Sequence, residues 1–405
     1  MDMIIRDAHI FDDSGLKDIA IGNGEISEIG KIDGDAEKEI DAEGRLISSC
    51  YIDPHIHLDK VLIVDDFPPN ESGTLQEAIE LIWERKRNYT IEEVKERAKE
   101  VMEMAISNGT LKMRTNVDVD TIGGLTPLKG VLAAREEIGD RMDLQIVAFP
   151  QEGIVRDPGT EELMRDAMEN GADLVGGMPH HEKSHEDAEE HVDIAFDIAK
   201  EFGVDIDMHV DETDDPNSRT LEIVADKTIE EGYEGRVTAA HTCALAAYPD
   251  DYAEKVIEKV KRAEINMVTN PATNLVIQGR DDNQPVRRGI TRVKELIEAG
   301  INVSFGQDCI KDAFYPFGKA DMLEVALITA HAAHLSMPDQ IRKVFRMMTE
   351  NAAKILGAGG EYGLEVGNPA DLVIVDAPSA WEAIRLQPNR RWVIRNGELC
   401  INPDE

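Results

Sequence analysis

The sequence predicts an α/β protein: a (β/α)8 barrel of the TIM type with a small β-sandwich built from the N- and C-terminal segments. Three observations predict this fold. Eight short apolar segments, seven of them with polar residues at their C-terminal ends, alternate with amphipathic helical patterns. Most successive ends lie roughly 30 residues apart, the spacing of eight units in a barrel of about 250 residues. Both ends of the chain have strand-and-turn sequence. We expect residues 1–50 and 358–405 to form the small β domain and residues 51–357 the barrel.

The N-terminal elements are predicted from alternation and turn residues. Met3–Ile10, Asp18–Ile21 and Glu25–Ile29 are strand-like, and Asn23-Gly24 is a hairpin signal between the last two. The eight barrel strands follow, and we expect them at Tyr51–His57, Lys112–Val119, Leu144–Gln151, Asp173–Met178, Asp205–Glu212, Val237–His241, Ile265–Asn270 and Ile301–Asp308.

Helical patterns fill the intervals between these strands. One helix begins after Thr90, which forms a capping box with Glu93. Wide gaps after His57 and Asn270 imply inserted loops. Further helices are expected at Asp187–Phe202 and Thr291–Ala299, and a last one near Ile341–Leu356; strands at Gly367–Asp376 and Arg391–Arg395 then return to the small β domain.

The composition excludes several classes of protein. Lys and Arg number 43 against 81 Asp and Glu, a formal net charge of −38 that disfavours nucleic-acid and membrane partners. The 42% of hydrophobic residues excludes wholesale disorder. The four cysteines have no CxxC spacing, and neither a signal peptide nor a run of about 18 apolar residues is present. We therefore expect a cytoplasmic protein that acts on a small molecule.

Polar side chains recur at the ends of seven of the eight predicted strands. They are His55, His57, Asn116, Gln151, His209, Glu212, His241, Asn270 and Asp308. Barrel enzymes build their active sites at the C-terminal ends of their strands, so these residues are expected to converge on one face.

Four of these residues form a candidate metal site. His55 and His57 alternate along one strand, so both imidazoles point to the same side. Together with His209 and Asp308 they suit one Zn²⁺ or Fe²⁺. Asp308 could also accept a proton from the attacking water, or simply cap a helix.

Three more residues are candidates for catalysis and substrate binding. Glu212, three residues beyond His209, can carry a proton from water to substrate as general acid and base, although a solvated loop acid is the alternative. His241 could be a further metal ligand or an electrophile that stabilises the forming alkoxide; the alternative is a histidine packed in the core. The Gln151 amide offers a donor and an acceptor to a ring with C=O and N–H edges. His180 and His181 are expected in a solvated loop.

Several longer motifs carry a family resemblance. They are Pro54-His55-Ile56-His57-Leu58-Asp59, the stretch 143–153 around Phe149-Pro150-Gln151, His209-Val210-Asp211-Glu212, Asn270-Pro271, Gln278-Gly279-Arg280 and the stretch 287–295. With these motifs the chain resembles the amidohydrolase superfamily, most closely its cytosine deaminase branch.

The resemblance implies roles for the candidate residues. His55, His57, His209 and Asp308 would hold the divalent metal, with Glu212 as proton shuttle. His241 would orient the attacking water, and Gln151 would bind the ring. Dinuclear relatives bridge their metals with a lysine on the fourth strand, which here ends Gly177-Met178-Pro179, so a single metal is expected. Such barrels often assemble, so a homo-oligomer is expected.

Three departures from the cytosine deaminase pattern concern the substrate. Cys309 stands where a second aspartate is usual and leaves room for a 5-substituent, and Phe314 replaces a tryptophan as the aromatic wall. Lys60 stands where a neutral residue is usual. A lysine at this position resembles the branch that removes alkylamines from hydroxylated triazines; the alternative is that Lys60 forms a salt bridge in a loop.

These inferences together predict a metal-dependent hydrolase of C–N bonds. The expected reaction converts cytosine, 5-methylcytosine or isocytosine to the oxo base and ammonia. The alternatives are an N-isopropylammelide-like amidohydrolase, deamination of a creatinine-like ring and, from another class, a non-catalytic barrel scaffold with a vestigial site.

Overall fold

The computed structural model describes residues 1–402 of the 405. Its centre is a sheet of eight parallel strands in the order β13-β12-β11-β10-β9-β8-β7-β6. The strands are β6 (Tyr51–Ile56), β7 (Thr110–Asp118), β8 (Asp143–Phe149), β9 (Leu174–Gly177), β10 (Ile206–Val210), β11 (Val237–His241), β12 (Asn266–Thr269) and β13 (Val303–Phe305). Each overlaps the strand expected from the sequence, and the predicted barrel is confirmed.

The two edge strands of this sheet meet and close the barrel. The Asp308 backbone N–H donates to the His55 carbonyl oxygen at 2.8 Å, and the His57 N–H donates to the Asp308 carbonyl at 3.0 Å. Gly306 permits this approach, because a Cβ there would lie 2.6 Å from both the Cβ and the carbonyl oxygen of His55. The closure thus brings two strand ends, about 250 residues apart in the chain, within hydrogen-bonding distance.

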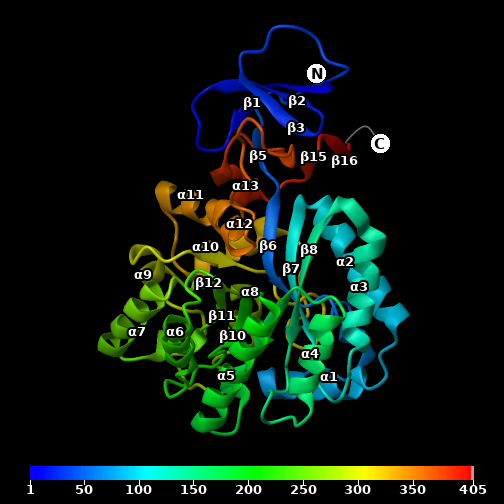
Figure 1. Ribbon diagram of the computed structural model, residues 1–405. Coiled ribbons are helices and arrows are strands. Elements are labelled where there is room, and N and C mark those ends of the chain that lie inside the picture. The colour runs from blue at the N-terminus through cyan, green and yellow to red at the C-terminus, as the bar shows by residue number, and fades with distance from the viewer. Residues whose placement is uncertain (403–405) are drawn as a thin grey trace.

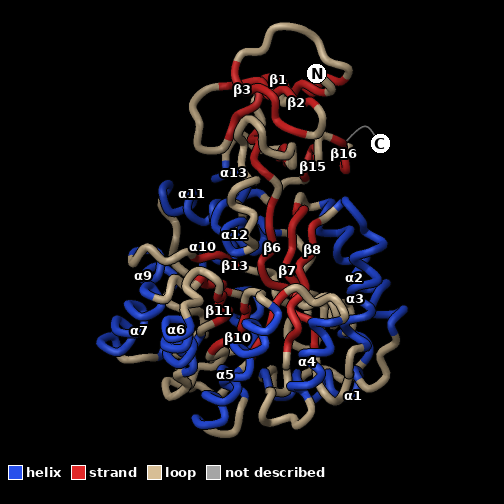
Figure 2. The backbone as a smooth tube through the Cα atoms, viewed as in Figure 1, coloured by secondary structure: helices blue, strands red, loops and turns tan. Residues whose placement is uncertain are grey.

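Helices surround the barrel strands, as Figure 2 shows in blue around red. The α-helices are α1 (Leu75–Lys86), α2 (Ile91–Ser107), α3 (Thr126–Ile138), α4 (Thr160–Glu169), α5 (His185–Phe202), α6 (Thr220–Glu231), α7 (Asp250–Arg262), α8 (Pro271–Ile277), α9 (Val293–Glu298), α10 (Met322–Ala332), α11 (Pro338–Met347), α12 (Glu350–Ile355) and α13 (Ala380–Leu386). Short 3-10 turns occur at Val64–Asp66, Gly139–Arg141, Pro179–His181 and Cys243–Ala247.

Helix α2 illustrates why these segments are helical. The Thr90 hydroxyl accepts a hydrogen bond from the Glu93 backbone N–H, which satisfies one of the free donors at the helix start. Residues three and four apart then face the barrel; they are Val94, Ala98, Val101, Met102 and Ala105, all buried. The helix predicted to begin after Thr90 is confirmed.

The last predicted helix is divided into two. The sequence indicates one helix near Ile341–Leu356, but α11 ends at Met347 and α12 begins at Glu350. The break leaves the Met348 carbonyl free to accept a hydrogen bond from the Ile52 N–H of β6 at 2.9 Å. A continuous helix would use this carbonyl internally, so the contact with the barrel outweighs helix continuity.

The two ends of the chain form a second sheet beside the barrel. Its strands run in the order β16-β15-β14-β5-β1-β2-β3, with β4 paired to β1. They are β1 (Met3–Ile10), β2 (Leu16–Gly22), β3 (Glu25–Gly30), β4 (Lys38–Asp41), β5 (Leu46–Ser49), β14 (Leu372–Val375), β15 (Arg390–Arg395) and β16 (Glu398–Ile401). Figure 1 shows the blue N-terminal and red C-terminal strands together above the barrel. The predicted pairing of the terminal segments is confirmed.

The segment between β6 and β7 is one of the expected insertions. It contains α1, which lies at the end of the barrel remote from the small sheet (Figure 1). Among residues 1–402, no helix combines the length and the apolar character needed to cross a bilayer.

Candidate active site

Four side chains from three strand ends meet inside the barrel. His55, His57, His209 and Asp308 are all buried, and one ligand atom from each lies within 4.8 Å of the others. The His57 and His209 Nε2 atoms are 3.0 Å apart, and Asp308 Oδ1 lies 3.5 Å from His55 Nε2 and 3.4 Å from His57 Nε2. The structure therefore brings the four predicted metal ligands together.

The chemistry of these side chains fits a divalent cation. His57 Nδ1 lies 3.0 Å from the Asn116 carbonyl and must donate to it, so its Nε2 presents a lone pair to the cluster. Burial and the nearby Lys60 lower the pKa of His57 to about 4, and burial with neighbouring imidazoles lowers the pKa of His209 well below its usual value. Neutral imidazoles are the form that binds metal.

The same cluster contains buried polar atoms that make no hydrogen bond within the described residues. Within residues 1–402, the His55 Nε2, His209 Nδ1 and Asp308 Oδ2 atoms are buried and make no hydrogen bond. Buried polar atoms are costly when unpaired, and a cation would satisfy those that face the centre of the cluster.

The backbone is strained at two of the strand ends. His241 and Asp308 both have φ of 67°, in the left-handed region that non-glycine residues seldom adopt. Such conformations cost about 1–3 kcal/mol each and persist where the surrounding structure enforces them.

Glu212 and His241 form a pair beside the cluster. Glu212 Oε1 lies 3.0 Å from His241 Nδ1 and accepts a 3.0 Å hydrogen bond from the Asn274 amide. Burial alone would lower the pKa of His241, but the Glu212 and Asp308 carboxylates raise it to about 9. His241 is therefore cationic near neutral pH and can donate hydrogen bonds, while Glu212 can accept a proton.

A small inner chamber adjoins the cluster. Lys60, Gln151, Glu212, Cys309 and Phe314 line it together with His57, His209 and Asp308. Its volume of about 20 Å³ admits about one water molecule. The predicted substrate-binding residues thus share one chamber with the predicted ligands, and a ring must displace side chains to enter it.

Residues 38–401 match the model of the amidohydrolase family. The chain belongs to the amidohydrolase family. The family resemblance inferred from the motifs is confirmed, and with it the expectation of an enzyme that hydrolyses C–N bonds.

Three relatives of this amidohydrolase are informative. 5-Methylcytosine deaminase from Klebsiella pneumoniae, liganded with 5-fluorocytosine, superposes with a TM-score of 0.95 at 39% identity, covering 99% of this chain and 97% of that one. N-isopropylammelide isopropyl amidohydrolase from Pseudomonas sp. (strain ADP) is 35% identical over 100% of this chain and 98% of its own length. Pterin deaminase from Rhizobium rhizogenes (strain K84 / ATCC BAA-868) is 31% identical over 94% and 87%.

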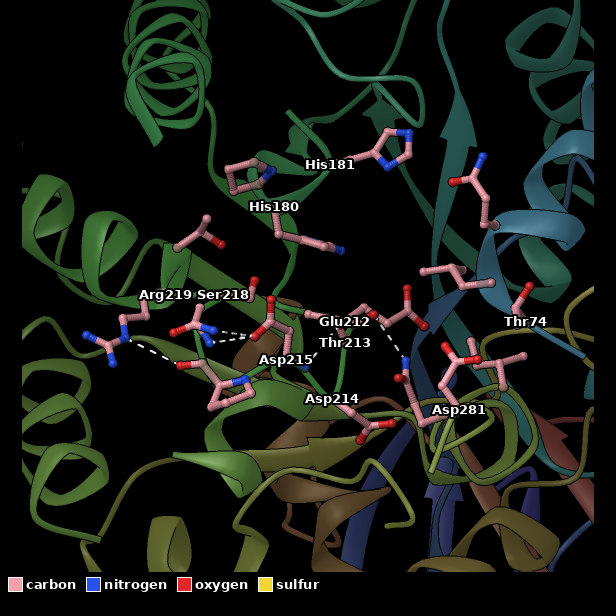
Figure 3. A pocket seen from close by; sticks show the side chains of 18 of the residues that line it. Thr74, His180, His181, Glu212, Thr213, Asp214, Asp215, Ser218, Arg219 and Asp281 are labelled. Atoms are coloured by element: carbon pink, nitrogen blue, oxygen red, sulfur yellow. Dashed lines mark hydrogen bonds between the residues drawn. The ribbon is translucent and has the colours of Figure 1, made fainter. Parts of the chain in front are cut away.

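A larger outer cleft leads to the chamber of this amidohydrolase. Its volume is about 880 Å³, and it shares Glu212 and Leu75 with the inner chamber. Figure 3 shows His180 and His181 on one side of this cleft and Asp214 on the other, with Glu212 between them. The sequence placed the two histidines in a solvated loop; instead they are half-buried in a 3-10 turn, and burial lowers the pKa of His180 to about 3.

A buried hydrogen bond between His191 and Glu182 fixes the loop that carries these histidines. His191 Nδ1 donates to Glu182 Oε1 at 2.7 Å, and its Nε2 accepts from the Met178 backbone N–H at 3.0 Å. Glu182 also accepts backbone hydrogen bonds from residues 154–156, just beyond Gln151. Burial lowers the pKa of His191 and keeps it neutral, although Glu182 opposes the shift.

Sequence reasoning missed other residues of the site. Asn274 lies one helical turn after Asn270, and this i, i+4 spacing was a signal that both reach the same centre. Asp118 lies two residues after Asn116 on β7, so strand alternation placed it on the same face. Lys86, at the end of α1, left no signal in the sequence, because its contacts are all tertiary.

Proposed function

We propose that this amidohydrolase deaminates a small aminated ring such as cytosine, 5-methylcytosine or isocytosine, giving the oxo base and ammonia. One observation carries the proposal. A buried set of three histidines and one aspartate opens onto a chamber lined by Glu212, Gln151 and Cys309. The similarity to 5-methylcytosine deaminase over almost the whole of both chains supports it.

The proposed cofactor is one Zn²⁺ or Fe²⁺ held by His55, His57, His209 and Asp308. When bound, such an ion lowers the pKa of a water molecule and polarises the substrate. The barrel, residues 51–357, would be the catalytic unit, and residues 1–50 and 358–405 the small β domain.

The side chains then divide the proton transfers between them. Glu212 would carry one proton of the attacking water to the ring nitrogen and the second proton of that water to the amino group, which leaves as ammonia. His241, whose Nδ1 lies 3.0 Å from Glu212 Oε1, would donate a hydrogen bond to the oxygen on which negative charge develops. Asp308 would assist in deprotonating the water, while Gln151 and Lys60 hold the ring against Phe314.

The second candidate is N-alkylamino-triazine hydrolysis. The Pseudomonas relative and the position of Lys60 in the inner chamber favour it. In this reaction the leaving group is an alkylamine, and the outer cleft next to Glu212 has room for its alkyl chain. The non-catalytic scaffold is disfavoured, because a vestigial site would not be expected to retain every ligand and the acid–base residue.

The test is a substrate panel with the full-length protein loaded with Zn²⁺ or Fe²⁺. Cytosine, 5-methylcytosine, isocytosine, creatinine and N-isopropylammelide are supplied, and release of ammonia, methylamine and isopropylamine is measured. We expect ammonia from one or more of the pyrimidines and loss of turnover after chelation. Isopropylamine alone would favour the triazine reaction, and no amine from any ring would refute the proposal.

We further propose that the protein is cytoplasmic and assembles as a homo-oligomer.

A further inference from the structure

The Lys60 ammonium occupies one wall of the inner chamber. It is almost fully buried, and its Nζ donates to Asp118 Oδ1 at 2.6 Å and to Gln151 Oε1 at 2.9 Å. It also lies 5.8 Å from the centre of the Phe314 ring. A lysine ammonium has three N–H donors and no acceptor, so the Gln151 atom that faces it must be the amide oxygen.

This contact fixes which half of the Gln151 amide remains for a substrate. The oxygen accepts from Lys60, while the one hydrogen bond of the NH₂ group within residues 1–402 is to the Met178 sulfur, at 3.4 Å. Thioether sulfur is a weak acceptor, so a substrate oxygen would replace it. The sequence suggested that Gln151 offers both a donor and an acceptor; in the structure it offers the chamber donors only.

A second buried lysine keeps Lys60 in this position. The Asp118 carboxylate bridges the two ammonium groups, with its Oδ2 accepting from Lys86 Nζ at 2.8 Å. Lys86 also contacts Asp120 and Glu152, and its side chain is fully buried at the end of α1. Burial would lower the pKa of Lys60, but the Asp118 and Asp59 carboxylates outweigh it and raise the pKa, so the ammonium stays charged. If Lys60 turned away, the buried Asp118 carboxylate would lose one of the two ammonium groups that balance its charge.

We propose that Lys60, held by Asp118 and Lys86, determines specificity by orienting the Gln151 amide, so that this wall of the chamber presents hydrogen-bond donors alone. The wall then accepts aminated rings that carry a carbonyl oxygen at this edge and rejects rings that carry a second amino group there. This inference rests on the proposed function and narrows its substrates to amino-oxo rings.

Two variants of the zinc-loaded full-length protein test the proposal. The kcat/KM values for cytosine and 2,4-diaminopyrimidine, which replaces the ring carbonyl by an amino group, are compared. In Lys60→Met the Gln151 amide can turn its oxygen to the amino group, so the preference for cytosine should fall at least tenfold. In Lys60→Arg the side chain again offers only donors, so the ratio of the two kcat/KM values should stay within about threefold of the wild-type ratio. A merely structural role would lower both activities together and leave the ratio unchanged, which would overturn the proposal.

Lys60→Met should fold, because Asp118 keeps Lys86 as its buried partner. A binding measurement on the wild-type protein decides the matter independently of folding and of turnover. Calorimetry with 2-pyrimidinone and pyrimidine, neither of which has an amine to lose, should show at least tenfold tighter binding of the oxo ring. Equal binding would overturn the inference. If no ring in the panel releases an amine but 2-pyrimidinone binds preferentially, the proposed reaction fails while the donor wall stands.

Discussion

Replacement of Glu212 by glutamine tests the proposed proton shuttle directly. The glutamate is buried, and its Oε1 lies 3.0 Å from both the Asn274 amide nitrogen and His241 Nδ1. Glutamine has nearly the same shape, and its oxygen can still accept from Asn274, but it cannot take up a proton. His241 would lose a carboxylate that raises its pKa and would become neutral more readily, so the variant does not leave an uncompensated buried cation.

The size of the effect follows from the role assigned to Glu212. A positioned general acid or base contributes about 10²–10⁴-fold, so kcat should fall by that factor, or about 3–5 kcal/mol in the barrier. Metal content should not change, because Glu212 lies outside the set His55, His57, His209 and Asp308.

The assay combines steady-state ammonia release from cytosine with metal analysis of the same samples. Glu190→Gln, at an exposed position of α5, is the matched control and should retain wild-type activity and metal. A loss smaller than about tenfold would refute the shuttle role. A loss of metal in proportion to activity would refute it as well, since Glu212 would then act by supporting the metal site.

Three further predictions concern stability and selectivity. Gly130→Ala should destabilise the protein by about 1–3 kcal/mol in chemical denaturation, because the new Cβ would lie 2.5 Å from the Val94 Cβ. The control, Lys129→Ala at an exposed position of the same helix, should change stability by less than about 0.5 kcal/mol. If Gly130→Ala raised the stability, the close packing of α3 on α2 would be contradicted. Neutral His191 in the fold takes up a proton less readily than an unfolded histidine with a pKa of about 6.5, so stability should fall as the pH drops from 7 to 5. In His191→Gln thermal midpoints should decline less steeply over that range, and an unchanged slope would exclude this contribution. Cys309→Asp should lower the ratio of 5-methylcytosine to cytosine turnover about tenfold, with Cys309→Ser as control, and an unaltered ratio would remove Cys309 as the discriminator.

The barrel and the cluster of candidate metal ligands could be predicted because their signals are local. Strand alternation puts His55 and His57, at the end of β6, on one side, and the polar ends of seven strands mark the face where active sites form. Closure of a parallel barrel then brings His209 and Asp308 to the same centre, whatever the loops between them do. The motifs around these residues carried the family resemblance as well.

The folded chain decided the details that depend on contacts between distant segments. Lys86 reaches Asp118 because the fold places α1 at the end of the barrel remote from the small sheet. The orientation of the Gln151 amide depends on Lys60, 91 residues away in sequence. The break between α11 and α12 likewise depends on a hydrogen bond to β6. Sequence periodicity reports which face of an element is buried. The partner of a buried charge is set by the packing of separate elements, because such a charge must be paired by whichever group the fold brings to it.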